Sequence, residues 1–232
     1  DSLRREVPGL VSVMVNLNRE DTNVVLGGKG FVLWGREWIT DELCGLRFRL
    51  SPQSFYQVNR RQAEILYGIA GDFASPGPED TVLDLYCGTG TIGLSMAKRA
   101  GQIVGVETVA QAVEDAKRNA EENGIENARF LCADAEEAAG QLLKEGIRPA
   151  AVILDPPRKG CAPGVIDSVT AMSPGRVVYV SCDPATLARD LKRFAERGYR
   201  TERVQPIDMF PRTPHVETVC LLSKFNTDLH SK

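Results

Sequence analysis

The chain has 232 residues, of which 43% are hydrophobic and 25% are charged, and its formal net charge is −3. This composition is typical of one globular domain, alone or with an appendage. No apolar run approaches the roughly 18 residues that a membrane helix needs, and the chain lacks the basic excess common in nucleic-acid-binding proteins. The sequence has no recognisable secretory signal, so we expect a cytoplasmic protein. It opens with Asp1 instead of Met, so we expect a fragment or a processed product. A monomer is the favoured oligomeric state.

The cysteines predict no metal site. Six occur in the chain, and none belongs to a Cys-x-x-Cys pair. Their spacing therefore favours neither a zinc site nor a disulfide framework, and we expect no bound metal. Cys132 and Cys220 fall in apolar runs, where cysteine behaves as a small hydrophobic residue.

Residues 1–50 are predicted to form an antiparallel β-rich segment, because short β-type runs alternate there with turn sequences. The runs cover residues 11–15, 23–26, 30–34 and 46–50. The segment is short for a core of its own, so we expect it to pack on the next domain or to belong to a larger module. Residues 51–232 form the second predicted domain.

Strands and helices alternate from residue 81 onward, which predicts an α/β fold with a doubly wound, Rossmann-like parallel sheet. A helix before this part ends at the Ser-Pro-Gly-Pro sequence of residues 75–78. No helix separates the last two strands, so we expect them to form a closing hairpin at one edge. The predicted strands are 82–86, 103–107, 128–132, 151–154, 177–181, 203–207 and 217–223. The predicted helices after residue 81 are 92–97, 109–120, 135–144, 163–172 and 184–197.

A glycine-rich turn follows the first strand of this alternation. Glycine permits a positive φ and a close approach of the backbone to a ligand, and open α/β sheets bind nucleotides at such turns. Gly88, Gly90 and Gly93 match the dinucleotide fingerprint, and Glu107 lies near the position of its ribose-binding acid. Asp84, just before the glycines, would repel a pyrophosphate. It favours a cationic ligand without phosphate, such as S-adenosylmethionine.

Three acids, Glu107, Asp134 and Asp155, end successive predicted strands. The carboxyl ends of parallel strands border the ligand crevice of such a sheet. Glu107 is suited to two ribose hydroxyls, or it is a solvated acid at a strand end. Asp134 either accepts a hydrogen bond from an adenine amino group or caps the next helix. Arg158 and Lys159 follow Asp155 and two prolines. This basic pair either contacts a phosphate or is surface charge on a stiff loop.

Cys182 is a candidate nucleophile and Glu217 a candidate base. Cys182 precedes a predicted helix with Asp183 as its N-cap and Pro184 in the first position. The helix dipole is expected to lower the pKa of the thiol from about 8.5; a buried structural cysteine is the alternative. Partial burial of Glu217, ahead of the last strand, would raise its pKa and suit it to proton abstraction. His215 is either a loop hydrogen-bonding residue or a partner of the thiol.

Five motifs stand in a fixed order along residues 51–223. They are Phe55-Tyr-Gln-Val-Asn59, Asp84-Leu-Tyr-Cys-Gly-Thr-Gly90, Asp155-Pro-Pro-Arg-Lys-Gly160, Ser181-Cys-Asp-Pro-Ala-Thr-Leu-Ala-Arg-Asp190 and His215-Val-Glu217. Together they resemble the RNA 5-methyluridine methyltransferases, which use S-adenosylmethionine and act on ribosomal RNA or the tRNA T-loop. Residues 21–27 resemble the central β domain of that family more loosely.

The resemblance implies the sheet of a class I methyltransferase, with S-adenosylmethionine as the cofactor. It implies that Cys182 is the nucleophile and that Glu217 removes a proton. Two features depart from the family pattern: Asp183 replaces a common Asn, and these residues include neither the family's RNA-binding barrel nor the cysteines of its iron–sulfur centre. The predicted cofactor contacts are Gln57, Tyr86, Thr91, Glu107, Asp134 and Asp155, together with Gly88 and Gly90 of the turn.

We therefore expect an RNA methyltransferase that moves a methyl group from S-adenosylmethionine to C5 of a uridine, through a covalent adduct between Cys182 and C6. The first candidate target is 23S ribosomal RNA and the second is tRNA, with Arg158 and Lys159 as substrate contacts. Two alternatives stay open from the sequence. One is another class I methyltransferase or an NAD-binding Rossmann enzyme that acts on a small molecule, and the other is a non-catalytic RNA-binding protein.

Overall fold

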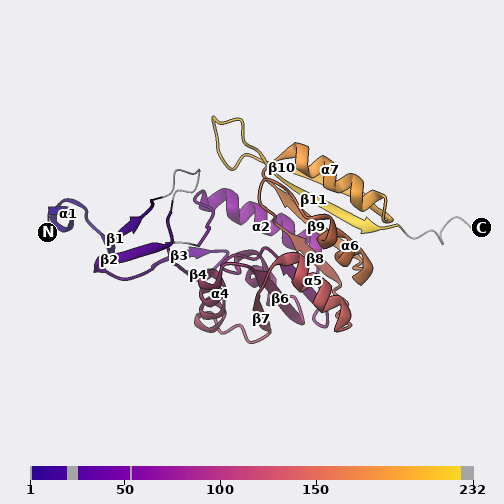
Figure 1. Cartoon of the computed structure of the whole chain (residues 1–232), viewed down its shortest axis with the longest axis horizontal. Helices are drawn as coiled ribbons and strands as arrows, with labels where there is room; N and C mark the ends of the chain where they lie inside the picture. Colours follow the sequence, from indigo (N-terminus) through magenta and orange to yellow (C-terminus); the bar gives the residue numbers. More distant parts are fainter. Residues whose placement is uncertain (1, 20–25, 53, 226–232) are drawn as a thin grey trace, which may run out of the picture.

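The computed structural model describes residues 2–19, 26–52 and 54–225 (Figure 1). The helices of this part are α1 (Ser2–Glu6), α2 (Arg60–Ala74), α3 (Thr91–Met96), α4 (Ala110–Glu122), α5 (Ala135–Lys144), α6 (Pro163–Met172) and α7 (Pro184–Ala195). The strands are β1 (Ser12–Leu17), β2 (Lys29–Gly35), β3 (Ile39–Leu43), β4 (Leu46–Leu50), β5 (Thr81–Leu85), β6 (Gln102–Glu107), β7 (Ala128–Cys132), β8 (Ala151–Leu154), β9 (Arg176–Ser181), β10 (Tyr199–Ile207) and β11 (Glu217–Lys224).

The main sheet has seven strands in the order β10-β11-β9-β8-β5-β6-β7. Strands β5 to β9 pair in parallel, and β11 pairs antiparallel with both β9 and β10. The predicted doubly wound α/β sheet with a closing hairpin is thus confirmed. The chain runs outward from β5 to β7 and then returns to β8 on the other side of β5. This reversal creates a topological switch point between β5 and β8, where such sheets bind ligands beyond the carboxyl ends of the strands.

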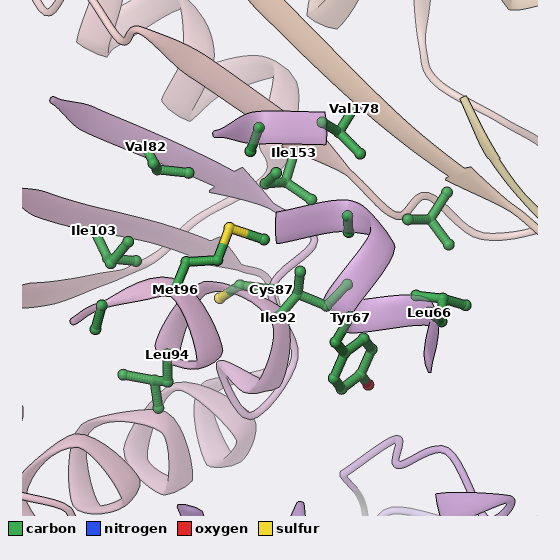
Figure 2. Packing of buried hydrophobic residues seen from close by; sticks show 14 of the residues in the cluster. Leu66, Tyr67, Val82, Cys87, Ile92, Leu94, Met96, Ile103, Ile153 and Val178 are labelled. Carbon is green, nitrogen blue, oxygen red and sulfur yellow. The ribbon is translucent and has the colours of Figure 1, made fainter. Parts of the chain in front are cut away.

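Helices cover both faces of the main sheet, so its central strands are almost wholly apolar. Successive residues of β5 show the arrangement: Val82 packs in the layer of α2, α3 and α4, and Leu83 packs in the layer of α5, α6 and α7. Both side chains have no exposed surface. Figure 2 shows part of the first layer, with Leu66, Tyr67, Val82, Cys87, Ile92, Leu94, Met96, Ile103, Ile153 and Val178 labelled.

The β3–β4 hairpin is fastened to the main domain by side chains of α4. Asn119, which has no exposed surface, accepts a hydrogen bond from Arg49 N (2.6 Å) and donates one to Arg49 O (3.3 Å). One turn further along α4, Asn123 makes the same pair of contacts with the backbone of Arg47. Two amides at i and i+4 therefore satisfy the free edge of β4, which would otherwise leave its backbone unpaired. Leu43 and Phe48 of the hairpin join the core layer of α2.

The β1–β2 ribbon stands apart from the main sheet, on the side of the N-terminus (Figure 1). The β10–β11 hairpin forms an edge of the main sheet, and the described part of the chain ends just beyond it. None of the helices in residues 2–19, 26–52 and 54–225 is long and apolar enough to cross a membrane.

Three details differ from the sequence-based expectations, and one expectation falls outside the described residues. The sequence analysis missed α1 and β3; β3 joins β4 through Cys44 and Gly45, both with positive φ, as the twist of a tight hairpin requires. Strand β10 begins at Tyr199, four residues before its predicted start. The predicted strand 23–26 lies almost wholly outside the described residues. Cys132 was expected to be buried but is exposed, because β7 is an edge strand of the sheet.

Candidate active site

The carboxyl ends of three neighbouring strands gather the first group of predicted site residues. The register of β5 with β6 and with β8 puts Tyr86 level with Glu107 on one side and with Asp155 on the other. Tyr86 has a φ of 67°, in the left-handed region. The backbone therefore turns sharply as soon as β5 ends, at the switch point of the sheet.

The glycine turn then leads into α3. Gly88 and Gly90 have φ values of 55° and 82°, which glycine adopts without strain. An added Cβ at Gly88 would meet nothing within 4 Å, so the backbone there borders open space. Gly93 donates its N–H to Asp84 Oδ2 (2.9 Å), and a Cβ at this glycine would lie 2.9 Å from the same oxygen. The turn is thus open toward a ligand on one side and packed on Asp84 on the other.

Four buried side-chain polar atoms find no hydrogen-bond partner within the described part of the chain. One is the donor Arg49 Nε, and the other three can accept: Gln57 Oε1, Asp84 Oδ1 and Thr89 Oγ1. Asp84 has only 1% of its surface exposed, and burial raises its pKa to about 7, although the N–H of Gly93 opposes the shift. Leaving a buried acceptor unpaired is costly, so such atoms call for a ligand or water. Sequence reasoning noticed Asp84 but did not assign it to the site, and it missed Thr89.

The carboxylates of Glu107 and Asp134 accept hydrogen bonds from backbone N–H groups. Glu107 accepts hydrogen bonds from the N–H groups of Gly88 (3.1 Å), Thr108 (2.7 Å) and Val109 (2.8 Å). This carboxylate ties the glycine turn to the end of β6. Asp134 is exposed and accepts from the N–H of Glu136 (2.8 Å), so it is the N-cap of α5, as one of its two predicted roles required.

The predicted contact Gln57 lies just before α2, and the predicted contact Thr91 is the first residue of α3. Gln57 is 6% exposed and lies in the segment that leads into α2. Thr91 opens α3, and its hydroxyl forms a hydrogen bond of 3.1 Å with the hydroxyl of Tyr67 on α2. The start of α3 is therefore held against α2.

The closing hairpin brings Cys182 and Glu217 together. In the antiparallel pair of β9 and β11, Ser181 is opposite Thr218. Cys182 directly follows Ser181, and Glu217 directly precedes Thr218, so the two occupy the next paired position. Asp183 accepts from the N–H groups of Ala185 and Thr186, which confirms the predicted N-cap of α7.

The pKa of the Cys182 thiol is raised, which overturns the expected lowering by the helix dipole. Burial is the main cause, followed by the negative charges of Glu217 and Asp155, and the charge of Arg158 opposes the shift only in part. Burial also raises the pKa of Glu217, as predicted, with Arg158 again opposing. The pKa of Asp155 rises to about 8, through burial and the charges of Glu217 and Asp84. The expected lowering did not take into account the burial of the thiol or the acids that come from other strands.

A clamp that sequence reasoning missed fixes the loop that carries Arg158 and Lys159. Thr186 donates its hydroxyl to Arg158 O (3.0 Å), and Arg189 donates a guanidinium N–H to Lys159 O (2.8 Å). Asp190, which has no exposed surface, accepts from the N–H of Cys161 and the hydroxyl of Tyr179, both at 2.8 Å. Three residues spaced i, i+3 and i+4 share one face of a helix. Their spacing within the motif of residues 181–190 could have indicated that these three side chains face the same neighbouring loop.

A cleft of about 330 Å³ opens at this point, bordered by Arg158, Cys182, Asp183, Pro184 and residues 214–216. Glu217 lies next to it with 5% of its surface exposed. The arrangement combines the thiol of Cys182, the carboxyl group of Glu217, whose pKa is raised, and the exposed cation of Arg158. It can form a covalent bond and move a proton in one place. Nowhere in the described residues do three or more His, Cys, Asp or Glu side chains gather to hold a metal ion.

Comparisons with known proteins agree with this geometry. The sequence is 47% identical to an uncharacterized RNA methyltransferase of Caldanaerobacter subterraneus subsp. tengcongensis, over 97% of this chain and 50% of the relative. An uncharacterized RNA methyltransferase of Lactiplantibacillus plantarum is 48% identical over 96% of this chain and 49% of its own length. The chain thus spans about half the length of the curated relatives it matches.

Solved structures lead to the same group. The crystal structure of a Pyrococcus abyssi tRNA (uracil-54, C5)-methyltransferase in complex with S-adenosyl-L-homocysteine aligns with a TM-score of 0.75 and 35% identity, over 91% of this chain and 50% of that one. A precorrin-6y C5,15-methyltransferase of Geobacter metallireducens, at 14% identity and a TM-score of 0.60 over 76% of this chain and 94% of its own, shares the fold alone. The profile of the tRNA (uracil-5-)-methyltransferase family matches residues 32–225. Since that match runs from β2 to the end of β11, the chain belongs to the tRNA (uracil-5-)-methyltransferase family.

Proposed function

We propose that the chain is the catalytic part of an RNA (uracil-C5)-methyltransferase that uses S-adenosylmethionine. The observation that carries the proposal is the position of Cys182 and Glu217, one step beyond the last pair of β9 and β11, with Cys182 in the wall of the cleft. Thymine-type methylation at a ring carbon needs a nucleophile and a base on the same pyrimidine. The family to which the chain belongs makes uracil the expected base.

The residues at the switch point fit S-adenosylmethionine. Its amino and hydroxyl groups are hydrogen-bond donors, and Gln57 Oε1, Asp84 Oδ1 and Thr89 Oγ1 are buried acceptors without a partner in the described chain. Its positive sulfonium and ammonium groups suit the acids Asp84 and Asp155. The open backbone at Gly88 leaves room for the ligand. We propose that Gln57, Tyr86, Gly88, Gly90, Thr91, Glu107, Asp134 and Asp155 contact it.

The mechanism follows from the needs of uracil, whose C5 is a poor nucleophile. The thiolate of Cys182 adds to C6, which forms the S–C6 bond and makes C5 electron-rich. C5 then forms a bond to the electrophilic methyl group that S-adenosylmethionine would supply when bound. The electrons of the broken sulfur–methyl bond would stay on the sulfur, so that S-adenosylhomocysteine is the leaving group. Glu217 then accepts the proton from C5, and the electrons of that C–H bond restore the ring double bond as the S–C6 bond breaks. Cys182 is thereby released as thiolate.

Burial suits Glu217 to this task, because a carboxylate with a raised pKa is a stronger base. The positive charge of Arg158 favours the thiolate of Cys182, which the nearby acids disfavour. Arg158 and Lys159 are both exposed and are the proposed RNA contacts. The uracil must leave its stack to reach the cleft.

Our proposed target is a uridine of 23S ribosomal RNA. The name of the Pyrococcus abyssi relative makes the tRNA T-loop the alternative. Methylation of unmodified 23S RNA and of tRNA transcripts, followed by mapping of 5-methyluridine, decides between them. Transfer to neither, with transfer to a small molecule, would contradict RNA as the substrate.

Trapping with RNA that contains 5-fluorouracil tests the mechanism, because fluorine at C5 cannot leave as a proton does. We expect the chain and the cofactor to form a stable covalent complex on a denaturing gel. Cys182→Ala should abolish the complex, whereas Cys132→Ala, which removes an exposed thiol on β7, should not. Glu217→Gln should accumulate an adduct with ordinary uridine RNA. A complex that persists in Cys182→Ala would disprove the nucleophile.

A further inference from the structure

A cavity that has no role in the proposed mechanism separates the β1–β2 ribbon from the main domain. It has two adjoining compartments of about 370 Å³ each, and Met14, Trp38 and Pro52 line both of them. Each compartment falls in the range of roughly 300–1,000 Å³ that is common for ligand sites. We call the two together the Trp38 cavity.

The first compartment contains an ordered stack of Arg49 on Trp38. The guanidinium carbon lies 3.5 Å from the centroid of the ring, within the range of a cation–π contact. The backbone of Arg49 is fixed on both sides by Asn119 of α4. The Nε atom of Arg49 is buried and finds no partner among the described residues. The stack therefore offers a fixed aromatic ring and an unused donor.

The second compartment is apolar, with Ile39, Leu50 and Tyr56 in its wall. Arg49 does not border this compartment, so Trp38 contributes to it a part of its surface that the guanidinium leaves free. The hydroxyl of Tyr56 donates to Asp41 Oδ2 (3.1 Å), which holds the second aromatic ring in place. The wall is thus suited to a flat, apolar group.

One stretch of chain links the wall of the Trp38 cavity to the candidate active site. Tyr56 lines the cavity, and the next residue, Gln57, is the buried residue with the unpaired acceptor. Two residues later, Asn59 donates a hydrogen bond to Met209 O (2.9 Å), in the loop that leads to Glu217. One stretch of chain, residues 56–59, therefore borders the cavity at one end and holds the loop before Glu217 at the other.

We propose that the Trp38 cavity binds an unpaired base of the RNA substrate, stacked on Trp38, other than the uridine that is methylated. The proposal rests on the proposed RNA methyltransferase function. Proteins commonly hold bases splayed out of single-stranded RNA between aromatic rings and arginine planes. Three acids, Glu37, Glu114 and Asp115, border the first compartment with two cations, Arg49 and Arg118. Because the acids outnumber the cations, the formal charge of the wall disfavours a phosphate, so the base enters and its backbone stays outside.

Tryptophan fluorescence tests this directly, because the chain has only two tryptophans. The Trp34→Phe variant leaves Trp38 as the sole emitter and does not alter the cavity wall. We expect saturable quenching when this variant is titrated with single-stranded oligoadenylate, which has no uracil and cannot be methylated. S-adenosylhomocysteine alone should leave the emission unchanged.

Kinetics give an independent measurement. Trp38→Leu should raise the Kd and the KM for substrate RNA about tenfold, since base stacking on an aromatic ring typically contributes that much or more. Its kcat and its Kd for S-adenosylhomocysteine should match those of the unaltered chain. Trp34→Phe is the matched control and should leave all four values unchanged. If Trp38→Leu does not fold, the fluorescence experiment still decides.

Two results would overturn the proposal. One is methylation of RNA by the Trp34→Phe variant without any change in Trp38 emission when RNA binds. The other is a Trp38 that acrylamide cannot reach, with or without RNA, in a polypeptide of the full length of the relatives; the cavity would then be filled by protein. If instead Trp38 responds to RNA while no methyl transfer and no S-adenosylhomocysteine binding occur, the proposed activity fails and the base site stands.

Discussion

Asn59 and Met209 lie 150 positions apart in the sequence and are joined by a hydrogen bond of 2.9 Å, from the side-chain amide of Asn59 to the backbone carbonyl of Met209. Asn59 is also the N-cap of α2, since its side-chain oxygen accepts from the N–H of Gln62. One side chain therefore both starts the helix beside the cofactor edge and secures the loop before Glu217. This double role can be separated by substitution.

Asn59→Ala should lower the free energy of unfolding by about 1–2 kcal/mol, because it removes both the cap and the contact with Met209. Asn59→Asp keeps the capping oxygen and loses the amide donor, so it should recover part of that stability. Both variants should lower kcat, because the loop that precedes Glu217 is no longer held. Urea unfolding and single-turnover methylation measure the two effects. Full activity in Asn59→Asp would show that the contact with Met209 has no role in catalysis.

Arg158 should set the pH range of the reaction. Its charge lowers the pKa of both Cys182 and Glu217. Burial opposes it at both groups, and the charges of Glu217 and Asp155 also oppose it at Cys182. Without that charge both pKa values rise, so the thiolate and the ionised carboxylate each become available only at higher pH. Arg158→Ala should therefore shift the pH–rate profile to the alkaline side and lower the rate at pH 7 on the order of tenfold.

Two controls separate this effect from RNA binding. Arg158→Lys keeps the charge and should keep the profile. Lys159→Ala, next to it, should raise the KM for RNA and weaken its salt dependence without moving the profile. An unshifted profile in Arg158→Ala, with only KM changed, would make Arg158 a phosphate contact alone.

Much of the fold was predictable because its signals are local. Pro184 and Asp183 predicted the start of α7, and the glycines after Asp84 predicted a turn into α3, since capping and positive φ depend on neighbouring residues. Strand β3 was missed because its sequence, Ile-Thr-Asp-Glu-Leu, has one apolar residue at each end and little β-type pattern. Its pairing with β4 depends on the turn at residues 44 and 45.

The proximity of the predicted site residues could be predicted from the sequence, whereas their electrostatics could not. The ends of parallel strands must meet, so Tyr86, Glu107 and Asp155 could be placed together from their order in the chain. The raised pKa of Cys182 could not be predicted, because it depends on how deeply the thiol lies and on an acid 35 positions away, Glu217. The Asn119 contacts with β4 were equally hidden, since nothing local marks an amide as a partner of a distant strand.

Asp84 should make stability depend on pH in an unusual direction. An acid whose pKa is raised on folding, here to about 7 from about 4 in the unfolded chain, binds its proton more tightly in the folded state. Its contribution to the free energy of unfolding is therefore lost as the pH rises from about 4 to about 7. Asp84→Asn cannot ionise, so it removes the free-energy cost of a buried carboxylate, and it keeps an oxygen that accepts from the N–H of Gly93. At pH 8 the variant should be more stable by about 1–3 kcal/mol.

Urea unfolding at pH 5 and pH 8 checks the Asp84 prediction, since the gain should be smaller at pH 5. The same variant should bind S-adenosylmethionine at least about tenfold more weakly in calorimetry, because a neutral amide replaces a buried acid. Equal destabilisation at both values of pH would mean that ionisation of Asp84 does not oppose folding.

Gly93 should be intolerant of any side chain. A Cβ there would lie 2.9 Å from Asp84 Oδ2 and 2.9 Å from Ile103 Cγ2, closer than real Cβ contacts. Both atoms belong to buried side chains of the main sheet, so one of them would have to shift within the packed core. Gly93→Ala should therefore destabilise the chain by about 1–3 kcal/mol through overpacking and weaken cofactor binding by displacing Asp84. Gly68→Ala is the matched control, because Gly68 is exposed in the middle of α2 and an added Cβ there would meet nothing within 4 Å. That variant should gain about 0.5–1 kcal/mol from helix propensity, with unchanged affinity for S-adenosylhomocysteine. If Gly93→Ala proves as stable as Gly68→Ala, then the turn and β5 are not packed as closely as these distances require.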